Sequence, residues 1–165
     1  MGPSYSQLKE TVSAKPLSKE EAPFLHYYDF NVSDPRRGIC AEKLLNNWNT
    51  AVGVNINTNI ITAEQYFSLD KLEDNVKYHL VVITPKTNTA MIIDLNKEIR
   101  FELANAGEKY IYDVSDYLKC GENHIYAAFL SRQLTDIKIR DKEITNIDCY
   151  ILKEYLGRYE EAHPC

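Results

Sequence analysis

From residue 52 to residue 156 the sequence is a succession of short segments rich in β-branched and aromatic residues, separated by turn residues such as Asn, Asp and Gly. In the clearest segment, residues 99–103, apolar and charged side chains alternate, which gives a β-strand one apolar and one polar face. The segments recur about every 8–12 residues, a spacing typical of antiparallel sandwiches and barrels. The sequence therefore predicts an all-β fold, an antiparallel jelly-roll β-sandwich over residues 51–156.

The expected strands follow one another with turn signals between them. They are expected near residues 52–61, 65–69, 77–83, 90–95, 98–103, 109–114, 124–130, 137–140 and 147–152. After residue 152 the apolar spacing also fits a helix, but Gly157 weakens a helix at this point. We therefore favour a strand to about Leu156, followed by a C-terminal tail over residues 157–165.

The first fifty residues differ from this pattern. Residues 1–21 are polar and mixed in charge, which is typical of a tail that cannot offset its own ordering entropy. Residues 22–31 are aromatic-rich and follow closely after the tail, with Pro23 near their start, which favours a strand or an extended arm. One short helix is predicted next, because apolar residues between 41 and 48 fall at helical spacing. The chain is thus divided into a polar N-terminal tail (1–21), an aromatic arm with a short helix (22–50) and the sandwich.

Charge and hydropathy exclude two classes of partner. The chain carries 24 acidic and 19 basic side chains, a net charge of −5, and its pI is near 5.4. A sequence-independent nucleic-acid binder would instead show a basic stripe. No stretch approaches the ~18 apolar residues of a membrane span, and the N-terminus shows no signal-peptide pattern. We expect no nucleic-acid partner, no membrane insertion, and a location in the cytoplasm or in a virion.

No catalytic or metal-binding set stands out in the sequence. The four histidines are scattered, and His79 and His124 each fall inside a predicted strand, so a packed or edge histidine is the default interpretation. Phosphate-binding loops and nucleophile elbows do not occur. The four cysteines are widely spaced and are expected to be reduced thiols, although Cys165 could crosslink two subunits. We expect a non-enzymatic protein with no cofactor, no metal and no catalytic residues.

One motif between residues 96 and 123 has a clear physical rationale. Asp113 or Ser115 can cap a short helical turn, and Leu118 can tuck under the sheet. Gly121 allows a positive φ before the next strand, and Asn123 can bond its own backbone. The candidate residues of this fold motif are Asn96, Asp113, Asp116, Leu118, Gly121 and Asn123.

From about Tyr66 to Leu130, this order of signals resembles the galactose-binding-like jelly roll at the N-terminus of family 2 glycoside hydrolases. The sequence departs from that pattern at Lys97, where the family usually has Gly, and at Cys120, where Pro is common. The resemblance implies a β-sandwich of sugar-binding type. In those hydrolases the catalytic carboxylates lie in a separate barrel domain, so the resemblance implies no catalytic residue here.

Twelve tyrosines are the most suggestive feature of the composition. Aromatic rings anchor protein interfaces, and they also stack on the apolar faces of sugars. Our first hypothesis is a non-enzymatic structural subunit of a larger assembly, such as a phage or virion capsid or tail, with protein subunits as partners. Its candidate interface residues are Phe24, Tyr27, Tyr28 and Phe30. The alternative is a carbohydrate-binding module with glycan partners, which requires exposed aromatic residues on one sheet face or at the loop tips.

Overall fold

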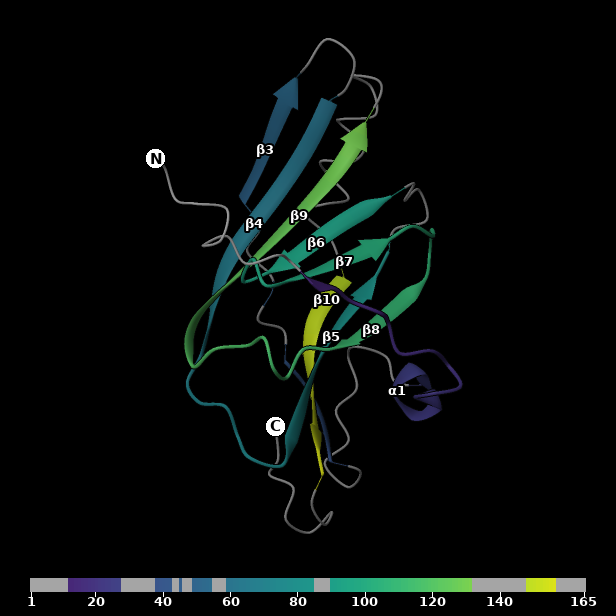
Figure 1. Ribbon diagram of the computed structural model, residues 1–165, viewed down its shortest axis with the longest axis vertical. Helices are drawn as coiled ribbons and strands as arrows, with labels where there is room; N and C mark the ends of the chain where they lie inside the picture. The colour runs from purple at the N-terminus through teal and green to yellow at the C-terminus, as the bar shows by residue number, and fades with distance from the viewer. Residues whose placement is uncertain are drawn as a thin grey trace.

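Two β-sheets lie face to face, with a short helix beside them, in the computed structural model of the chain (Figure 1). The structure describes residues 12–27, 38–42, 45, 49–54, 59–84, 90–131 and 148–156. The helix is α1 (Pro23–Tyr27). The strands are β1 (Val12–Ser13), β2 (Ile39–Glu42), β3 (Asn49–Val54), β4 (Asn59–Leu69), β5 (Val76–Ile83), β6 (Met91–Leu95), β7 (Ile99–Leu103), β8 (Lys109–Asp113), β9 (Gly121–Ser131) and β10 (Asp148–Tyr155).

The strand order is that of a jelly roll. One sheet has the order β1-β7-β6-β9-β4-β3 and the other has the order β2-β10-β5-β8. The chain passes from one sheet to the other between β4, β5 and β6, forms the β6–β7 hairpin, and then alternates again through β8, β9 and β10. Eight of these strands therefore form two facing sheets of four, with β1 and β3 added at opposite edges of one sheet. This topology confirms the predicted all-β jelly-roll sandwich.

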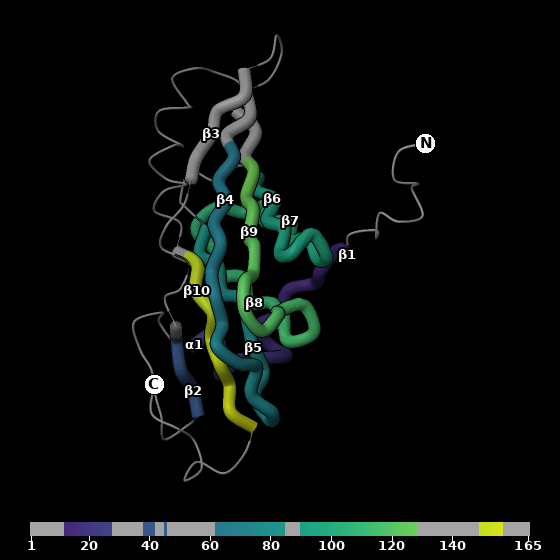
Figure 2. The backbone as a smooth tube through the Cα atoms, turned by 90° about the vertical axis from the view of Figure 1, so that its left-hand side faces the viewer, coloured from purple at the N-terminus to yellow at the C-terminus, as the bar shows by residue number. Residues whose placement is uncertain are grey.

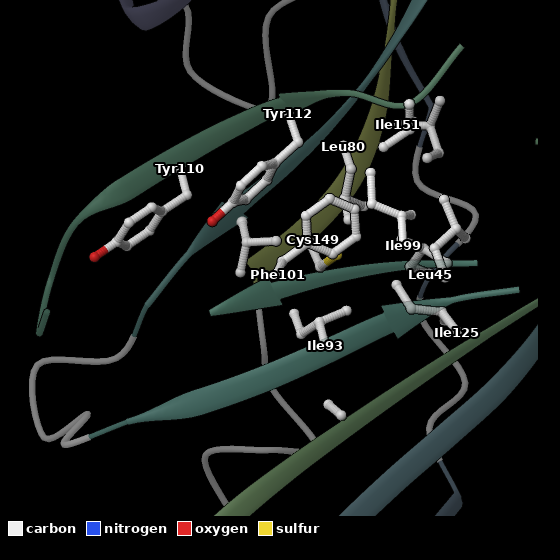
Figure 3. Close-up of a cluster of buried hydrophobic side chains, with 14 of the residues drawn as sticks. Leu45, Leu80, Ile93, Ile99, Phe101, Tyr110, Tyr112, Ile125, Cys149 and Ile151 are labelled. Atoms are coloured by element: carbon white, nitrogen blue, oxygen red, sulfur yellow. The ribbon is translucent and has the colours of Figure 1, made fainter. Parts of the chain in front are cut away.

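The core lies between the two sheets, where alternate side chains of each strand point inward. In β7 the inward residues are Ile99, Phe101 and Leu103, as the alternating sequence predicted. Phe101 is fully buried, and its ring centroid lies 4.3 Å from that of Tyr112 on β8. Figure 3 shows these side chains reaching from both sheets into the same space. Because one sheet face is buried, the register of each strand is strongly specified.

The segment before β2 packs along the sandwich. It begins at β1, which pairs in parallel with β7, and ends at α1 beside the second sheet (Figure 2). Between them, the amide of Leu17 donates a hydrogen bond of 2.7 Å to the carbonyl of Ile111 on β8. Leu25 of α1 is buried on the outer face of the four-stranded sheet. It joins a second apolar cluster with Ile39, Val81, Ile111, Tyr150 and Leu152.

Two local predictions are wrong. Residues 23–27 form α1 instead of a strand or an extended arm. The missed signal is the turn that precedes the helix, in which the amide of Glu21 donates a hydrogen bond to the Ser18 hydroxyl and the amide of Ala22 donates one to the Ser18 carbonyl. The predicted helix over 41–48 is not formed at its start, because Ala41 lies in β2 and pairs with Leu152 of β10. That pairing partner lies more than a hundred residues away, so local spacing could not reveal it.

The cysteines also depart from expectation. Cys40, buried on β2, is disulfide-bonded, so the prediction of four reduced thiols is wrong at this position. Cys120 is an exposed free thiol beside Gly121. Cys165 and the predicted strand over 137–140 lie outside the described residues.

Candidate functional site

The motif residues Asn96 and Asn123 meet at one end of the six-stranded sheet. Residues 96–98 join β6 to β7, and the amide of Glu98 donates a hydrogen bond of 3.0 Å to the carbonyl of Leu95, so that Asn96 and Lys97 are the central residues of a β-turn; both have positive φ, 53° and 57°. This pair of values is that of a type I′ hairpin turn. The Asn96 side chain donates hydrogen bonds to the carbonyl of Tyr117 (2.7 Å) and to Oδ1 of Asn123 (2.9 Å), and it accepts one from the amide of His124 (2.8 Å). The hairpin turn is thus fastened to the loop that precedes β9.

Asn123 holds that loop from inside. Its side chain is buried, with 1% of its surface exposed. Oδ1 accepts a hydrogen bond from the amide of Lys119 (2.8 Å), while Nδ2 donates to the carbonyls of Lys119 (2.9 Å) and Gly121 (3.2 Å). One amide side chain therefore satisfies several backbone groups of the loop that would otherwise need water.

The other motif residues surround the same loop. Asp113 accepts hydrogen bonds from the amide (3.0 Å) and hydroxyl (2.7 Å) of Ser115, and the Ser115 hydroxyl accepts one from the amide of Tyr78 on β5. Leu118 is buried, and Gly121 has a φ of +91°. Asp116 lies exposed on the turn. The motif residues thus shape a loop and tie it to both sheets.

Beside this loop, a groove of about 790 Å³ runs over the outer face of the six-stranded sheet. Its walls at one end are the β6–β7 turn and the loop before β9, and its floor comes from β4, β9, β6 and β7. The lining residues are Glu64, Tyr66, Asp94, Asn96, Lys97, Arg100, Lys119, Glu122, Asn123, His124 and Tyr126. The period-two alternation of the strands explains this set, since the neighbouring residues of β4 and β9 face the core.

The floor carries a row of polar side chains that crosses four strands. Glu64 of β4 pairs with Tyr126 of β9, Tyr126 pairs with Asp94 of β6, and Asp94 pairs with Arg100 of β7. Nε of Arg100 donates a hydrogen bond of 3.1 Å to Oδ1 of Asp94. A guanidinium has five N–H donors and a carboxylate has two oxygens, so this ion pair keeps further hydrogen-bonding capacity for a ligand.

An aromatic surface lies next to this row. Tyr66 is 59% exposed, and its ring centroid is 4.7 Å from the His124 ring in a tilted arrangement. Nε2 of His124 lies 2.8 Å from Oε2 of Glu64, which holds the imidazole in place. The contact between the two rings in turn limits the orientations open to Tyr66.

The phenol of Tyr126 remains protonated at neutral pH. Burial raises the pKa of Tyr126 above its ordinary value of 10.0, and the negative charges of Asp94 and Glu64 raise it further. Its hydroxyl is therefore a hydrogen-bond donor as well as an acceptor at the centre of the groove.

The predicted interface residues lie elsewhere. Phe24 and Tyr27 are exposed on α1, beside the four-stranded sheet, while Tyr28 and Phe30 lie outside the described residues. The groove residues were not identified as a site from the sequence, because strand pairing and not sequence proximity brings them together. The alternation around Glu64 and Tyr66 was the only local signal that these two share a face.

Among the described residues, no group of three or more His, Cys, Asp or Glu side chains is placed to hold a metal ion. Within the same residues, no helix has the length and apolar character needed to cross a membrane.

The fold and the groove define a jelly-roll sandwich with a polar, aromatic site on one sheet face. No family model matches the sequence, and no curated protein matches it. Among solved structures, the chain is similar to a β-glucuronidase from an uncultured Clostridium sp., with a TM-score of 0.35 and 19% identity over 42% of this chain and 12% of that chain. It is also similar to the Cnp3 cupin domain of Schizosaccharomyces pombe, with a TM-score of 0.19 and 10% identity over 62% and 74% of the two chains. Neither likeness is close enough to carry a functional argument.

Proposed function

We propose that this chain is a carbohydrate-binding module and that the groove on the six-stranded sheet is its binding site. The observation that carries the proposal is the exposed ring of Tyr66 in a groove whose other lining groups are hydrogen-bonding side chains. A sugar ring has apolar C–H faces and hydroxyl edges, so it suits a flat aromatic ring beside such donors and acceptors.

The composition of the groove favours a sugar over a protein partner. Among the described residues that line it, every side chain is polar or aromatic and none is aliphatic. The buried centre of a protein interface is depleted in charged residues, and this groove is rich in them. The resemblance of residues 66–130 to galactose-binding-like modules of family 2 glycoside hydrolases agrees with this proposal. Such a module would be located outside the cell or on a virion, where it could bind glycans.

The test is binding of the full chain to a glycan array, followed by calorimetry on the best glycan. Tyr66→Ala should weaken binding about tenfold, because the stacking surface is lost. Tyr27→Ala is the matched control, because it also removes an exposed tyrosine (91% exposed) but does so on α1, away from the groove. Binding to no glycan, or equal binding by Tyr66→Ala and wild type, would refute the proposal.

We propose a structural subunit as the second candidate function, because α1 presents two aromatic side chains outward. Leu25 anchors α1 in the second apolar cluster, and Nζ of Lys109 donates a hydrogen bond of 3.1 Å to the carbonyl of Leu25. Because α1 is anchored in this way, Phe24 and Tyr27 are exposed at defined positions, which suits aromatic residues that bind a protein partner.

Light scattering after size exclusion tests this second candidate. The full chain should assemble, and Tyr27→Ala should shift it toward the monomer, whereas Tyr66→Ala should leave assembly unchanged. A full chain that stays monomeric at every concentration and binds no second protein chain would contradict it. The same two variants thus separate the two candidate functions.

A further inference from the structure

The charges that line the groove balance one another. Three acidic and three basic side chains line it: Glu64, Asp94, Glu122, Lys97, Arg100 and Lys119. On the floor, Asp94 is paired with Arg100, and Glu64 is paired with His124. At the rim, Nζ of Lys119 lies 4.0 Å from Oε1 of Glu98. Because the acidic and basic side chains that line the groove are equal in number, the groove has no excess positive charge to attract an anion.

The polar and aromatic groups extend across the sheet and not along one strand. Tyr66 stands on β4 and Arg100 on β7, and β9 and β6 lie between them. Three strand spacings of ~4.8 Å separate the two strands by roughly 14 Å. One sugar ring cannot contact both side chains over that distance, whereas a chain of linked rings can.

The two ends of this row have different chemistry. At the β4 end, beside Glu64 of the row, Tyr66 offers an aromatic face that contacts the His124 ring. At the β7 end, the Asp94–Arg100 pair offers both acceptors and donors in a fixed geometry. Neighbouring hydroxyls of a sugar each donate and accept a hydrogen bond, so they match a carboxylate and a guanidinium placed side by side.

We infer that the groove binds an uncharged oligosaccharide laid across the strands, with one sugar ring on Tyr66 and another held by Asp94 and Arg100. This inference rests on the proposed carbohydrate-binding function and specifies its ligand class. Tyr126 of β9 stands between Glu64 and Asp94 in the row, beneath the part of the oligosaccharide that joins these two sugar rings.

The experiment is calorimetric titration of the full chain with two series of oligosaccharides of one to five rings. One series is neutral and is prepared from the backbone that the glycan array selects, and the other has the same linkage with uronate rings. For the neutral series, affinity should rise with the number of rings until the ligand reaches from β4 to β7, and then level off. Uronate oligosaccharides of equal length should bind more weakly.

Variants locate the two contacts. Arg100→Ala should lower the affinity of the longer neutral ligands about tenfold and leave the shortest ligand unchanged, because charged hydrogen bonds are lost only at the β7 end. Asp94→Asn, which keeps the shape of the side chain, should act in the same direction. Tyr66→Ala should weaken every ligand, and Tyr27→Ala, which removes an exposed tyrosine of α1 that does not line the groove, is the control.

The outcomes distinguish this inference from the function on which it rests. Affinity that does not depend on ring number, a preference for uronates, or an equal effect of Arg100→Ala on all lengths would overturn the inference while carbohydrate binding stands. Failure of every glycan to bind the wild-type chain would overturn both. Far-ultraviolet circular dichroism of each variant verifies that the sandwich is folded.

Discussion

Replacing Asn123 by Ala should unfold the loop before β9 and lower the stability of the whole sandwich. Asn123 is almost fully buried and takes part in four hydrogen bonds, with the amide of Lys119, the side chain of Asn96, and the carbonyls of Lys119 and Gly121. At about 0.5–1.5 kcal/mol each, four bonds amount to about 2–6 kcal/mol. Lys119 and Gly121 are exposed, so water replaces part of the loss, and we expect a decrease of about 3 kcal/mol in the free energy of unfolding.

Urea unfolding followed by circular dichroism measures this change. The matched control is Glu122→Ala, because Glu122 is the exposed neighbour of Asn123 and its loss should alter the free energy of unfolding by less than about 0.5 kcal/mol. A loss below about 1 kcal/mol for Asn123→Ala would show that the loop does not depend on this side chain. The reasoning about the motif would then be refuted.

Three other substitutions test separate parts of the structure. Lys97→Gly should stabilise the protein by about 0.5–1 kcal/mol in urea unfolding, because Lys97 has a left-handed φ that glycine adopts without strain; a destabilised variant would contradict this. Phe101→Ala should destabilise it by about 3–5 kcal/mol, since the ring is fully buried between the sheets, and Phe101→Leu should cost clearly less. A hydrogen bond with His79 lowers the pKa of Glu154 below its ordinary value of 4.5, despite burial, so the carboxylate stabilises the fold above that pH. This stability should be lost as the pH falls through the lowered pKa, and urea unfolding at a series of acidic pH values should show no such contribution for Glu154→Gln.

The strands were the most predictable part of the fold. In residues 99–103 the alternation of Ile, Arg, Phe, Glu and Leu identifies both the strand and its inward face, and β7 has that face buried. Residues 77–83 form most of β5, and their nearly continuous apolar run fits a strand buried on both faces, with Leu80 and Val82 in the core between the sheets and Val81 in the second apolar cluster. When only one face of a strand is buried, the apolar residues recur at every second position, so the alternation in the sequence identifies the buried face directly.

The errors lie where a short segment depends on a distant partner. Ala41 has neighbours at helical spacing, yet it pairs with Leu152 on β10 because the edge of the second sheet offers backbone hydrogen bonds there. Residues 23–27 are aromatic enough for a strand, but Leu25 reaches the second apolar cluster from a helix. Local propensity is weak for segments of four or five residues, so tertiary contacts decide their conformation.

The candidate site also combines features that local sequence patterns predict with features that depend on contacts between distant residues. The sequence alone predicted an antiparallel sandwich, and it singled out Asn96, Gly121 and Asn123 as residues that shape its loops. It could not place Tyr66 beside Asp94 and Arg100, because β5 separates β4 from the β6–β7 hairpin in the chain and β9 separates them in the sheet. Only the jelly-roll strand order, which sets β9 and β6 between β4 and β7, assembles them into one groove. Alternation within a strand is a local property, whereas the order of strands in a sheet results from the packing of the whole core.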